Sequence, residues 1–353
     1  MLIIAFCIAL FFAMNIGASG AAASMGVAYA SGALKKKSIA LLICGTAIIL
    51  GSVFGGQRVV KTISSGIIPD QIFTIEVVVL TLLAATLSLF VANILGIPLS
   101  TSEITVGAVA GVGIAYHVLF VGKLLFVMVF WIITPVVAFS ITYAVGKLIH
   151  RLNSKYPGLE NRKWRPLFTF LVILTGFFEA YSAGMKNVAN AVGPLVGAHL
   201  LSMNAATLLG GIFVALGAIL LGNKVLETNG KKITSVSLME GISISATSSL
   251  LVITAALFGI PLPIAQITTS AIIGIGSAQQ GAKVFQKQVV TQMLKVWFVA
   301  PFLSLLLSYS FVKLLLESDV YSVFIVAAGS IATIGVASLL KGAKKNETGG
   351  IAR

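Results

Sequence analysis

Residues 96–105 read GIPLSTSEIT, and residues 259–268 read GIPLPIAQIT. Six of the ten positions are identical, and two glycines follow each copy at matching places. Other segments match in the same order: residues 11–12 and 17–20 with 177–178 and 184–187, and residues 60–62 with 226–228. Ordered matches at offsets of 163 to 167 residues indicate an internal duplication.

The composition places this duplicated chain in a lipid bilayer. Of its 353 residues, 58% are hydrophobic and 10% are charged, and the mean hydropathy is +1.05. A soluble domain of this size could not bury so much apolar surface. A spanning helix needs about 20 apolar residues. Such windows predict about eleven segments: 2–32, 38–57, 72–95, 97–117, 122–146, 167–200, 203–222, 235–258, 262–280, 289–316 and 320–340.

Basic residues fall mostly on one side of the predicted membrane. If the segments alternate, that side collects the lysines and arginines of residues 35–37, 147–165, 224–232, 283–287 and 341–353, and the other side has only Arg58, Lys61 and Lys123. The positive-inside rule makes the basic side cytoplasmic. We therefore expect a multi-pass protein of the cell membrane with its N-terminus outside and its C-terminus in the cytoplasm. The net charge of +14 then needs no nucleic-acid partner.

Each copy of the repeat holds five predicted spans. Because five is odd, the second copy must enter the membrane in the opposite sense, as in many secondary transporters. We predict an all-α polytopic membrane protein of two inverted-topology five-span repeats with broken helices at the midplane, plus a C-terminal span. The predicted parts are 1–146 for the first repeat, 147–166 for a basic cytoplasmic linker, 167–316 for the second repeat, and 317–353 for the final helix and basic tail.

The first apolar run is too long for one straight span. Residues 2–34 would extend about 50 Å as a helix, against a hydrocarbon core of about 30 Å. We expect a break near its middle, which carries Gly17, Ser19, Gly20 and Ser24, and a second break at residues 184–194. Helix N-termini that face a cavity favour anions, so two facing breaks predict an anion site. Alternatively, the small residues serve close helix packing.

Polar side chains in apolar runs supply candidates for that site. Lys186, Asn187 and Asn190 are costly in lipid and need partners. Ser100, Thr101 and Ser102 follow a helix-breaking proline and could donate to an oxyanion, or could simply cap a helix. The second copy of this motif keeps only two hydroxyls nearby, those of Thr268 and Thr269.

Three carboxyl groups could carry a proton through the membrane. A carboxyl in a medium of low dielectric constant is more easily protonated than one in water. We rank Glu103 first, Glu240 second, and Glu179 third. Because Glu179 lies two helical turns before Lys186, an internal ion pair is the alternative for that residue.

Residues 14–18 read MNIGA and residues 188–195 read VANAVGPL. These segments resemble the Pit family of inorganic phosphate transporters, whose signature Gly-Ala-Asn-Asp-Val-Ala-Asn-Ala occurs once in each inverted half. Residues 96–102 are similar to the other repeated motif of the family. The resemblance covers most of the chain. It implies an inverted-repeat carrier of an inorganic oxyanion.

Both signature aspartates are missing from this chain. Ser19-Gly20 stands in place of Asn-Asp in the first half, and Lys186-Asn187 in the second. In the family those carboxylates are implicated in sodium-coupled uptake, so their loss argues against a sodium site built on them. A gained lysine suits a full dianion such as sulfate. The pattern looks like the bacterial sulfate permease branch of the family, which is regarded as proton-driven.

We therefore predict a symporter that imports sulfate or a related tetrahedral oxyanion together with protons. In this hypothesis the Lys186 ammonium takes the place of a bound sodium ion. A cation-coupled phosphate transporter is the nearest alternative, and a passive anion channel is a further one. A purely structural or signalling protein would leave the Lys186 cluster unexplained.

The sequence predicts no enzymatic activity, cofactor or metal site. Cys7 and Cys44 lie in apolar runs, and no nucleophile–base pair, metal-ligand spacing or phosphate-cradling loop is present. The expected partners are the oxyanion, protons and the lipid bilayer. Relatives in the family also suggest a homodimer.

Overall fold

The computed structural model describes residues 1–94, 100–156, 163–223, 225–226, 236–286, 288–326 and 328, and over these residues it is helical with no strand. The first half contains α1 (Leu2–Ile16), α2 (Gly26–Ala30), α3 (Lys37–Gly55), α4 (Gln57–Lys61), α5 (Ile75–Ile94), α6 (Thr101–Ala115) and α7 (Val121–Lys155). The second half contains α8 (Arg165–Gly197), α9 (Met203–Leu221), α11 (Leu238–Leu257), α12 (Ile264–Gln280) and α13 (Gln288–Leu315). Residues 96–99 of the first motif copy and most of the predicted last span lie outside the described residues.

The helices confirm a multi-pass membrane protein. Within the described residues, six helical segments are long and apolar enough to cross a bilayer: Leu2–Ala30, α3, α7, α8, α9 and α11. By contrast, α6 has 15 residues and is about 22 Å long at about 1.5 Å per residue. This length is less than a hydrocarbon core of about 30 Å, so the predicted window 97–117 holds a helix too short to span by itself.

The predicted breaks at residues 17–24 and 184–194 differ from the structure. In the first half, the chain passes through a π-helical turn (Gly17–Ala21) and a 3-10 turn (Ala22–Met25) but stays helical. In the second half, α8 runs without interruption through Asn187 and Pro194 to Gly197, so the prediction of a broken helix there is wrong. The physical reason is that a helix satisfies its own backbone hydrogen bonds in lipid, whereas an unwound segment needs other partners.

The second half is instead interrupted at its Gly-Ile-Pro-Leu motif, whereas residues 95–99, which include the first copy, lie outside the described residues. Helix α5 ends at Ile94 and α6 begins at Thr101, while α11 ends at Leu257 and α12 begins at Ile264. In the second motif, Gly259 has φ +73°, a left-handed conformation that glycine adopts readily, and two prolines follow it. These residues stop one helix and turn the chain into the next.

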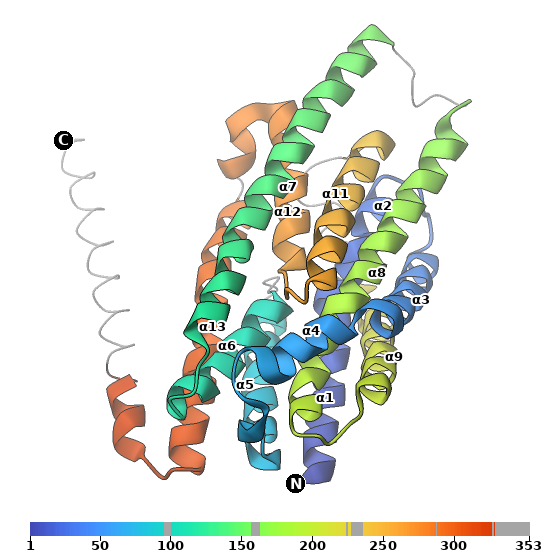
Figure 1. The fold of residues 1–353 in the computed structure, drawn as a ribbon. Coiled ribbons are helices and arrows are strands. Elements are labelled where there is room, and N and C mark those ends of the chain that lie inside the picture. The colour runs from blue at the N-terminus through green and yellow to red at the C-terminus, as the bar shows by residue number, and fades with distance from the viewer. Residues whose placement is uncertain are drawn as a thin grey trace, which may run out of the picture.

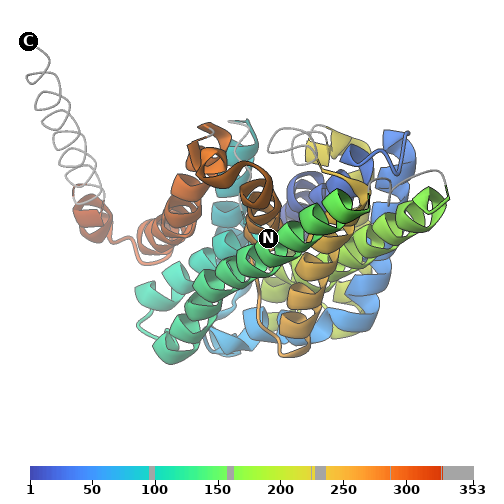
Figure 2. The same ribbon diagram turned by 90° about the horizontal axis from the view of Figure 1, so that it is seen from above.

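Long helices of the first and second halves of the chain run in opposite directions. Figure 1 shows α1 and α7 rising from the end of the molecule near the N-terminus, whereas α8 and α13 descend toward it. Helix α12 packs along α7 and α6 packs along α13, so each short helix lies on a long helix of the other half. Seen from above, α3, α8 and α9 lie together on one side of the molecule and α6 and α13 on the other (Figure 2).

Close glycine contacts also occur in matching pairs. A Cβ on Gly17 of the first half would overlap the backbone of Val214 in α9, and one on Gly184 would overlap the backbone of Ile48 in α3. A Cβ on Gly111 or Gly274 would likewise meet backbone of α13 or α7, respectively. Glycine is needed at these places because the facing backbones approach so closely. For Gly17, the structure therefore favours the packing alternative over a place in an unwound anion site.

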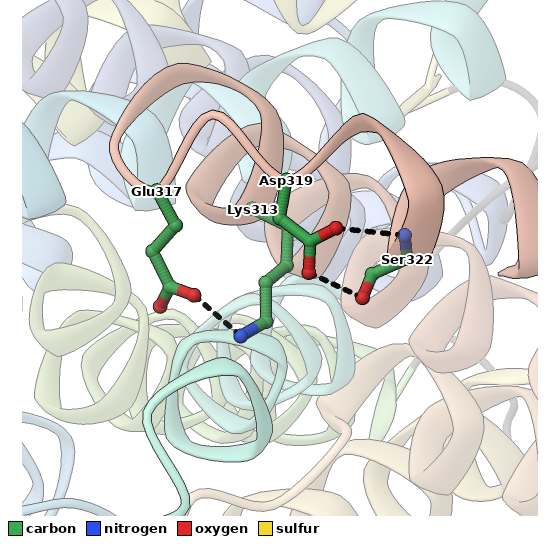
Figure 3. Close-up of polar contacts among 4 residues, drawn as sticks. All are labelled: Lys313, Glu317, Asp319 and Ser322. Carbon is green, nitrogen blue, oxygen red and sulfur yellow. Dashed lines mark hydrogen bonds and ion pairs between the residues drawn. The ribbon is translucent and has the colours of Figure 1, made fainter.

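Polar contacts organise the turn that follows α13. Lys313 Nζ donates to Glu317 Oε2 over 2.6 Å. The Asp319 carboxylate accepts from the backbone N–H and the hydroxyl of Ser322, over 3.0 and 2.5 Å (Figure 3). Asp319 thus caps the helical residues that begin at position 320, and these hydrogen bonds lower its pKa.

Candidate functional site

The N-terminal ends of α6 and α12 meet in the interior. The Ser100 hydroxyl accepts from the backbone N–H of Glu103 at the start of α6, which is a helix cap. The next hydroxyl, Ser102 Oγ, donates to the carbonyl oxygen of Leu262 over 3.2 Å. From this meeting point the two short helices run away from each other (Figure 1). Two helix N-termini, each with a partial positive charge, therefore converge on one place.

A buried polar cluster joins α6 to the middle of α8. We define the central cluster as Thr101, Ser102, Lys186, Asn187 and Asn190. Thr101 Oγ1 donates to Asn187 Oδ1 over 3.0 Å and accepts from Asn190 Nδ2 over 3.1 Å. Lys186 Nζ donates to Ser102 Oγ over 3.2 Å. Asn190 lies about one helical turn after both Lys186 (i, i+4) and Asn187 (i, i+3), so these three side chains share one side of α8.

The charge of Lys186 is unusual for such a buried place. Its side chain is 1% exposed, and it donates to a neutral hydroxyl, that of Ser102. No carboxylate in the described part of the chain forms an ion pair with it. A buried ion without a counterion costs several kcal/mol. An anion held beside Lys186 would remove much of this cost.

Amide groups of the central cluster also retain unused hydrogen-bonding capacity. Among the described residues, Asn187 Nδ2 and Asn190 Oδ1 are buried and have no hydrogen-bond partner. A Cβ on Gly20 would stand 3.9 Å from Asn187 Nδ2, so the turn after α1 lies beside the cluster. Buried polar groups are normally paired. The unused Asn187 donor is available to an oxyanion oxygen.

Glu103 faces the other half of the chain. Its Oε1 accepts from Gln266 Nε2 over 2.5 Å, and its Oε2 is buried with no hydrogen-bond partner in the described residues. Glu103 is 3% exposed and directly follows Ser102, which the Lys186 ammonium contacts. A buried carboxyl with one oxygen unpartnered among these residues therefore adjoins the central cluster.

Glu179 on α8, the third predicted carboxyl, has a different partner from the one expected. Glu179 is fully buried and its Oε1 accepts from Thr268 Oγ1 of α12 over 2.5 Å. It does not pair with Lys186, so the alternative of an internal ion pair on α8 is wrong. Thr268 instead links α12 to α8, and the neighbouring Thr269 is buried in α12.

Several predicted residues lie outside the central cluster. Glu240 belongs to a capping box with Ser237 at the start of α11, and its other oxygen accepts from Gln279 over 2.6 Å. The Ser19 hydroxyl donates to the backbone of its own helix at Asn15. Ser24 is buried in the 3-10 turn, and its hydroxyl has no partner among the described residues. The contacts of Glu240 with Ser237 and Gln279 give it a structural role as a helix cap.

Two residues that complete the site were absent from our list of candidates. Gln266 binds Glu103, and Trp131 of α7 donates its Nε1–H to the carbonyl oxygen of Pro261 over 3.0 Å, which holds the α11–α12 turn in place. For Gln266 a signal existed, since it occupies the position of Glu103 in the second copy of the duplicated motif. For Trp131 no sequence pattern pointed to the contact.

The chemistry of the central cluster suits a small oxyanion. The Lys186 ammonium and the Asn187 amide N–H, which has no partner in the described residues, can donate to anionic oxygens. The hydroxyl hydrogens of Thr101 and Ser102 are already donated within the protein. A hard cation prefers several oxygen ligands, and a neighbouring lysine would repel it. The geometry thus matches an anion better than a cation at this place.

Comparison with known proteins adds an independent finding. The model of the phosphate transporter family (PHO4) matches residues 16–308. The chain is 57% identical over 336 residues to sulfate permease CysP of Bacillus subtilis (strain 168), which covers 95% of this chain and 94% of that protein. It also has the fold of a sodium-dependent phosphate transporter of known structure, with a TM-score of 0.78 and 24% identity over 89% of this chain and 99% of that one.

These relatives are permeases and transporters, in agreement with the prediction that the chain is not an enzyme. The matches and the helical architecture lead to the same conclusion about what kind of molecule this is. The chain belongs to the phosphate transporter (Pit) family and is a multi-pass membrane transporter.

Proposed function

We propose that this chain is a proton-coupled importer of sulfate or a closely related tetrahedral oxyanion. The observation that carries the proposal is the buried Lys186, which has hydroxyl and amide neighbours and no carboxylate ion pair in the described residues. The identity of 57% to a sulfate permease supports the same substrate. The substrate-binding groups are those of the central cluster, joined by the backbone at Ser19 and Gly20.

The charges explain why a dianion fits. Sulfate carries two negative charges and offers oxygens that only accept hydrogen bonds. The ammonium of Lys186 neutralises part of that charge, and the Nδ2–H of Asn187, unpartnered within the described part of the chain, can donate to one oxygen. Phosphate differs because it carries protons that need an acceptor near it. Asn187 stands where the family has an aspartate, so the carboxylate acceptor of the family is missing at this position.

Proton coupling follows from the place of Glu103. An ionised carboxylate repels a dianion beside it, so sulfate binds more strongly when Glu103 carries a proton. In the transport cycle the carboxyl takes up a proton on one side, moves with sulfate bound, and releases the proton on the other side. Glu103 is better placed for this role than Glu240, which caps α11. Glu179 is the second candidate, because it is buried beside Thr268.

We further propose that the two halves are inverted repeats, as the sequence predicts. The opposite directions of α1 and α8, the matching glycine contacts and the exchanged packing of α6 and α12 support this architecture. The proposed units are 1–146 and 167–316, with a linker at 147–166 and a last part at 317–353. The basic side is proposed to be cytoplasmic, which places the N-terminus outside. A homodimer stays a prediction.

Phosphate is the second candidate substrate. The likeness to a sodium-dependent phosphate transporter favours it, although at 24% identity that likeness concerns the fold. Ammonium and amide donors would serve either oxyanion. The two proposals differ in the coupling ion, since phosphate uptake of that kind would need sodium and the present one needs protons.

Uptake into proteoliposomes tests the proposal. Purified protein is reconstituted, and uptake of labelled sulfate is followed with an imposed pH gradient, an imposed sodium gradient, or neither. We expect accumulation driven by the pH gradient and little competition by phosphate. Accumulation of labelled phosphate that requires sodium would replace sulfate by the second candidate. Equilibration without accumulation in every gradient would indicate a passive channel.

A further inference from the structure

A second group of cations lies away from the central cluster. Arg58, Lys61 and Lys123 are the basic residues of the sparsely charged side of the protein, and all three line one cavity of about 400 Å³. The cavity also contains Thr62 and Ser65 and is closed on one side by residues 257–259 of the α11–α12 turn. We call it the basic cavity. Its lining includes no acidic residue.

The basic cavity is held in shape by contacts between the two halves. The Arg58 guanidinium donates to the carbonyl oxygen of Leu257. Thr62 Oγ1 donates to the carbonyl oxygen of Gly259 over 2.7 Å, and a Cβ at Gly259 would stand 2.9 Å from that hydroxyl. Glycine therefore lets the turn approach the helix that carries the cations. These hydrogen bonds fix the two walls of the cavity relative to each other.

The positive charges of the cavity are not neutralised within the described residues. No carboxylate there forms an ion pair with Arg58, Lys61 or Lys123. Lys123 Nζ lies 5.6 Å from the ring centroid of Phe120. This contact with a neutral ring does not neutralise the charge of the ammonium. Three cations around one concave surface produce a focused positive potential, which concentrates anions and speeds their arrival.

The cavity and the central cluster share one structural element. The α11–α12 turn contributes residues 257–259 to the cavity, and three residues later Leu262 accepts from Ser102 of the central cluster. An anion in the basic cavity would thus touch the same turn that holds the N-terminal end of α6. This arrangement suits a site that the oxyanion occupies before it reaches the central cluster.

We propose that Arg58, Lys61 and Lys123 form an anion-capture site that receives the oxyanion before it reaches the central cluster. The hydroxyls of Thr62 and Ser65 supply neutral donors beside the cations. The site would take sulfate, phosphate or the phosphate of a lipid headgroup, which share the chemistry of a tetrahedral oxyanion. Its role as an entry station rests on the proposed transport function, whereas anion binding in the cavity does not.

Cysteine modification tests the cavity without any need for transport. Ser65→Cys is introduced with Cys7→Ser, since Cys7 is exposed whereas the remaining Cys44 is buried. Its rate of reaction is compared for an anionic and a cationic methanethiosulfonate reagent of similar size. We expect the anionic reagent to react faster by on the order of 10-fold. Sulfate or inorganic phosphate at millimolar concentration should slow it.

A matched pair of variants shows whether the cations are responsible. Lys61→Gln with Lys123→Gln removes two charges from the cavity, and Lys147→Gln with Lys155→Gln removes two from exposed lysines elsewhere. The preference for the anionic reagent should fall only in the first pair. An unchanged preference in the first pair would overturn the proposal. The proposal would also be overturned if phosphatidylglycerol vesicles slowed the reaction with the anionic reagent and sulfate did not. The cavity would then hold lipid headgroups.

Transport gives a separate readout. If the proposed function holds, the cavity pair should raise KM for sulfate by about 3- to 10-fold and leave kcat nearly unchanged. The rise should shrink at high ionic strength, where free charges are screened. If no sulfate uptake is seen but the reagent preference behaves as expected, the capture site stands and the proposed function fails. A normal KM in an active cavity pair would exclude the entry role.

Discussion

Gln266 donates to Glu103 over 2.5 Å, although the two residues are 163 positions apart and occupy the same place in the two copies of one motif. The contact joins the beginnings of α6 and α12. The two residues are therefore counterparts in the duplicated motif that contact each other directly. Here the counterparts are a carboxyl and an amide, so the pair keeps its hydrogen bond while only one side can carry a proton.

The first prediction concerns coupling. Glu103→Gln keeps a side chain of the same shape beside Gln266 but cannot exchange a proton. We expect it to abolish pH-driven accumulation of sulfate while exchange of labelled for unlabelled sulfate continues. The measurement is a comparison of net uptake with exchange in the same proteoliposomes.

Glu240→Gln is the informative comparison for coupling. Glutamine can also serve in a capping box, so α11 should keep its start and coupling should persist. If Glu240→Gln removes pH-driven uptake and Glu103→Gln does not, the assignment of the proton carrier is wrong.

The second prediction concerns Lys186, whose replacement should weaken sulfate binding without lowering the stability of the protein. Lys186→Met removes a buried charge that has no carboxylate counterion in the described residues, so the substrate-free protein should unfold at an equal or higher temperature. Sulfate affinity should fall by about 10- to 100-fold, because a hydrogen bond to a charged group contributes roughly 1.5–3 kcal/mol. Thermal unfolding with and without sulfate measures both effects.

Lys147→Met serves as the matched control, because Lys147 is exposed. It should change neither the unfolding temperature nor its shift with sulfate. A Lys186→Met protein that sulfate still stabilises as well as it does the original protein would remove Lys186 from the binding site.

The third prediction concerns the hydroxyl that ties α6 to α8. Thr101→Val preserves shape but leaves Asn187 and Asn190 each without one partner. We expect a loss of about 1–3 kcal/mol in stability, the usual cost of a buried polar group left unpaired. Thr134→Val is the control, since Thr134 bonds only within its own helix at Phe130. Equal melting temperatures for the two variants would contradict the role of Thr101.

The fourth prediction tests close packing of helices. Gly184→Ala would place a methyl group against the backbone of Ile48, and backbone cannot move aside as a flexible side chain can. We expect a loss of about 1–3 kcal/mol or failure to accumulate folded protein. Gly122→Ala, which meets no atom within 4 Å, should be tolerated. Size-exclusion profiles in detergent compare the two, and similar profiles would argue against the tight contact.

Much of the architecture could be predicted because it depends on patterns along the chain. Hydropathy indicates membrane helices, since apolar runs of sufficient length have nowhere else to be buried. The duplicated motifs at 96–105 and 259–268 indicated the repeat, and the second copy also marks where α11 gives way to α12. The interruption was expected at small residues near 17–24 and 184–194, where the structure keeps helix. Small residues permit both unwinding and close packing, and a local sequence does not distinguish these outcomes.

The site was predicted in part for the same reason. Polar residues in apolar runs are few, so Thr101, Ser102, Lys186, Asn187 and Asn190 could be chosen from the sequence alone, and they form one hydrogen-bonded cluster. Glu240 satisfied the same criterion but caps a helix. Partner choice depends on which helix faces which, and that is not encoded by composition.

By itself, the sequence determined that this protein lives in a membrane, that one motif occurs in it twice, and which polar residues need an explanation. These properties are local, because each follows from the cost of placing a side chain or a backbone group in lipid. Only the tertiary structure decided that Glu103 meets Gln266, that Glu179 binds Thr268 rather than Lys186, and that three scattered cations share one cavity. Those contacts join segments far apart in the chain, and they arise from the packing of whole helices against each other.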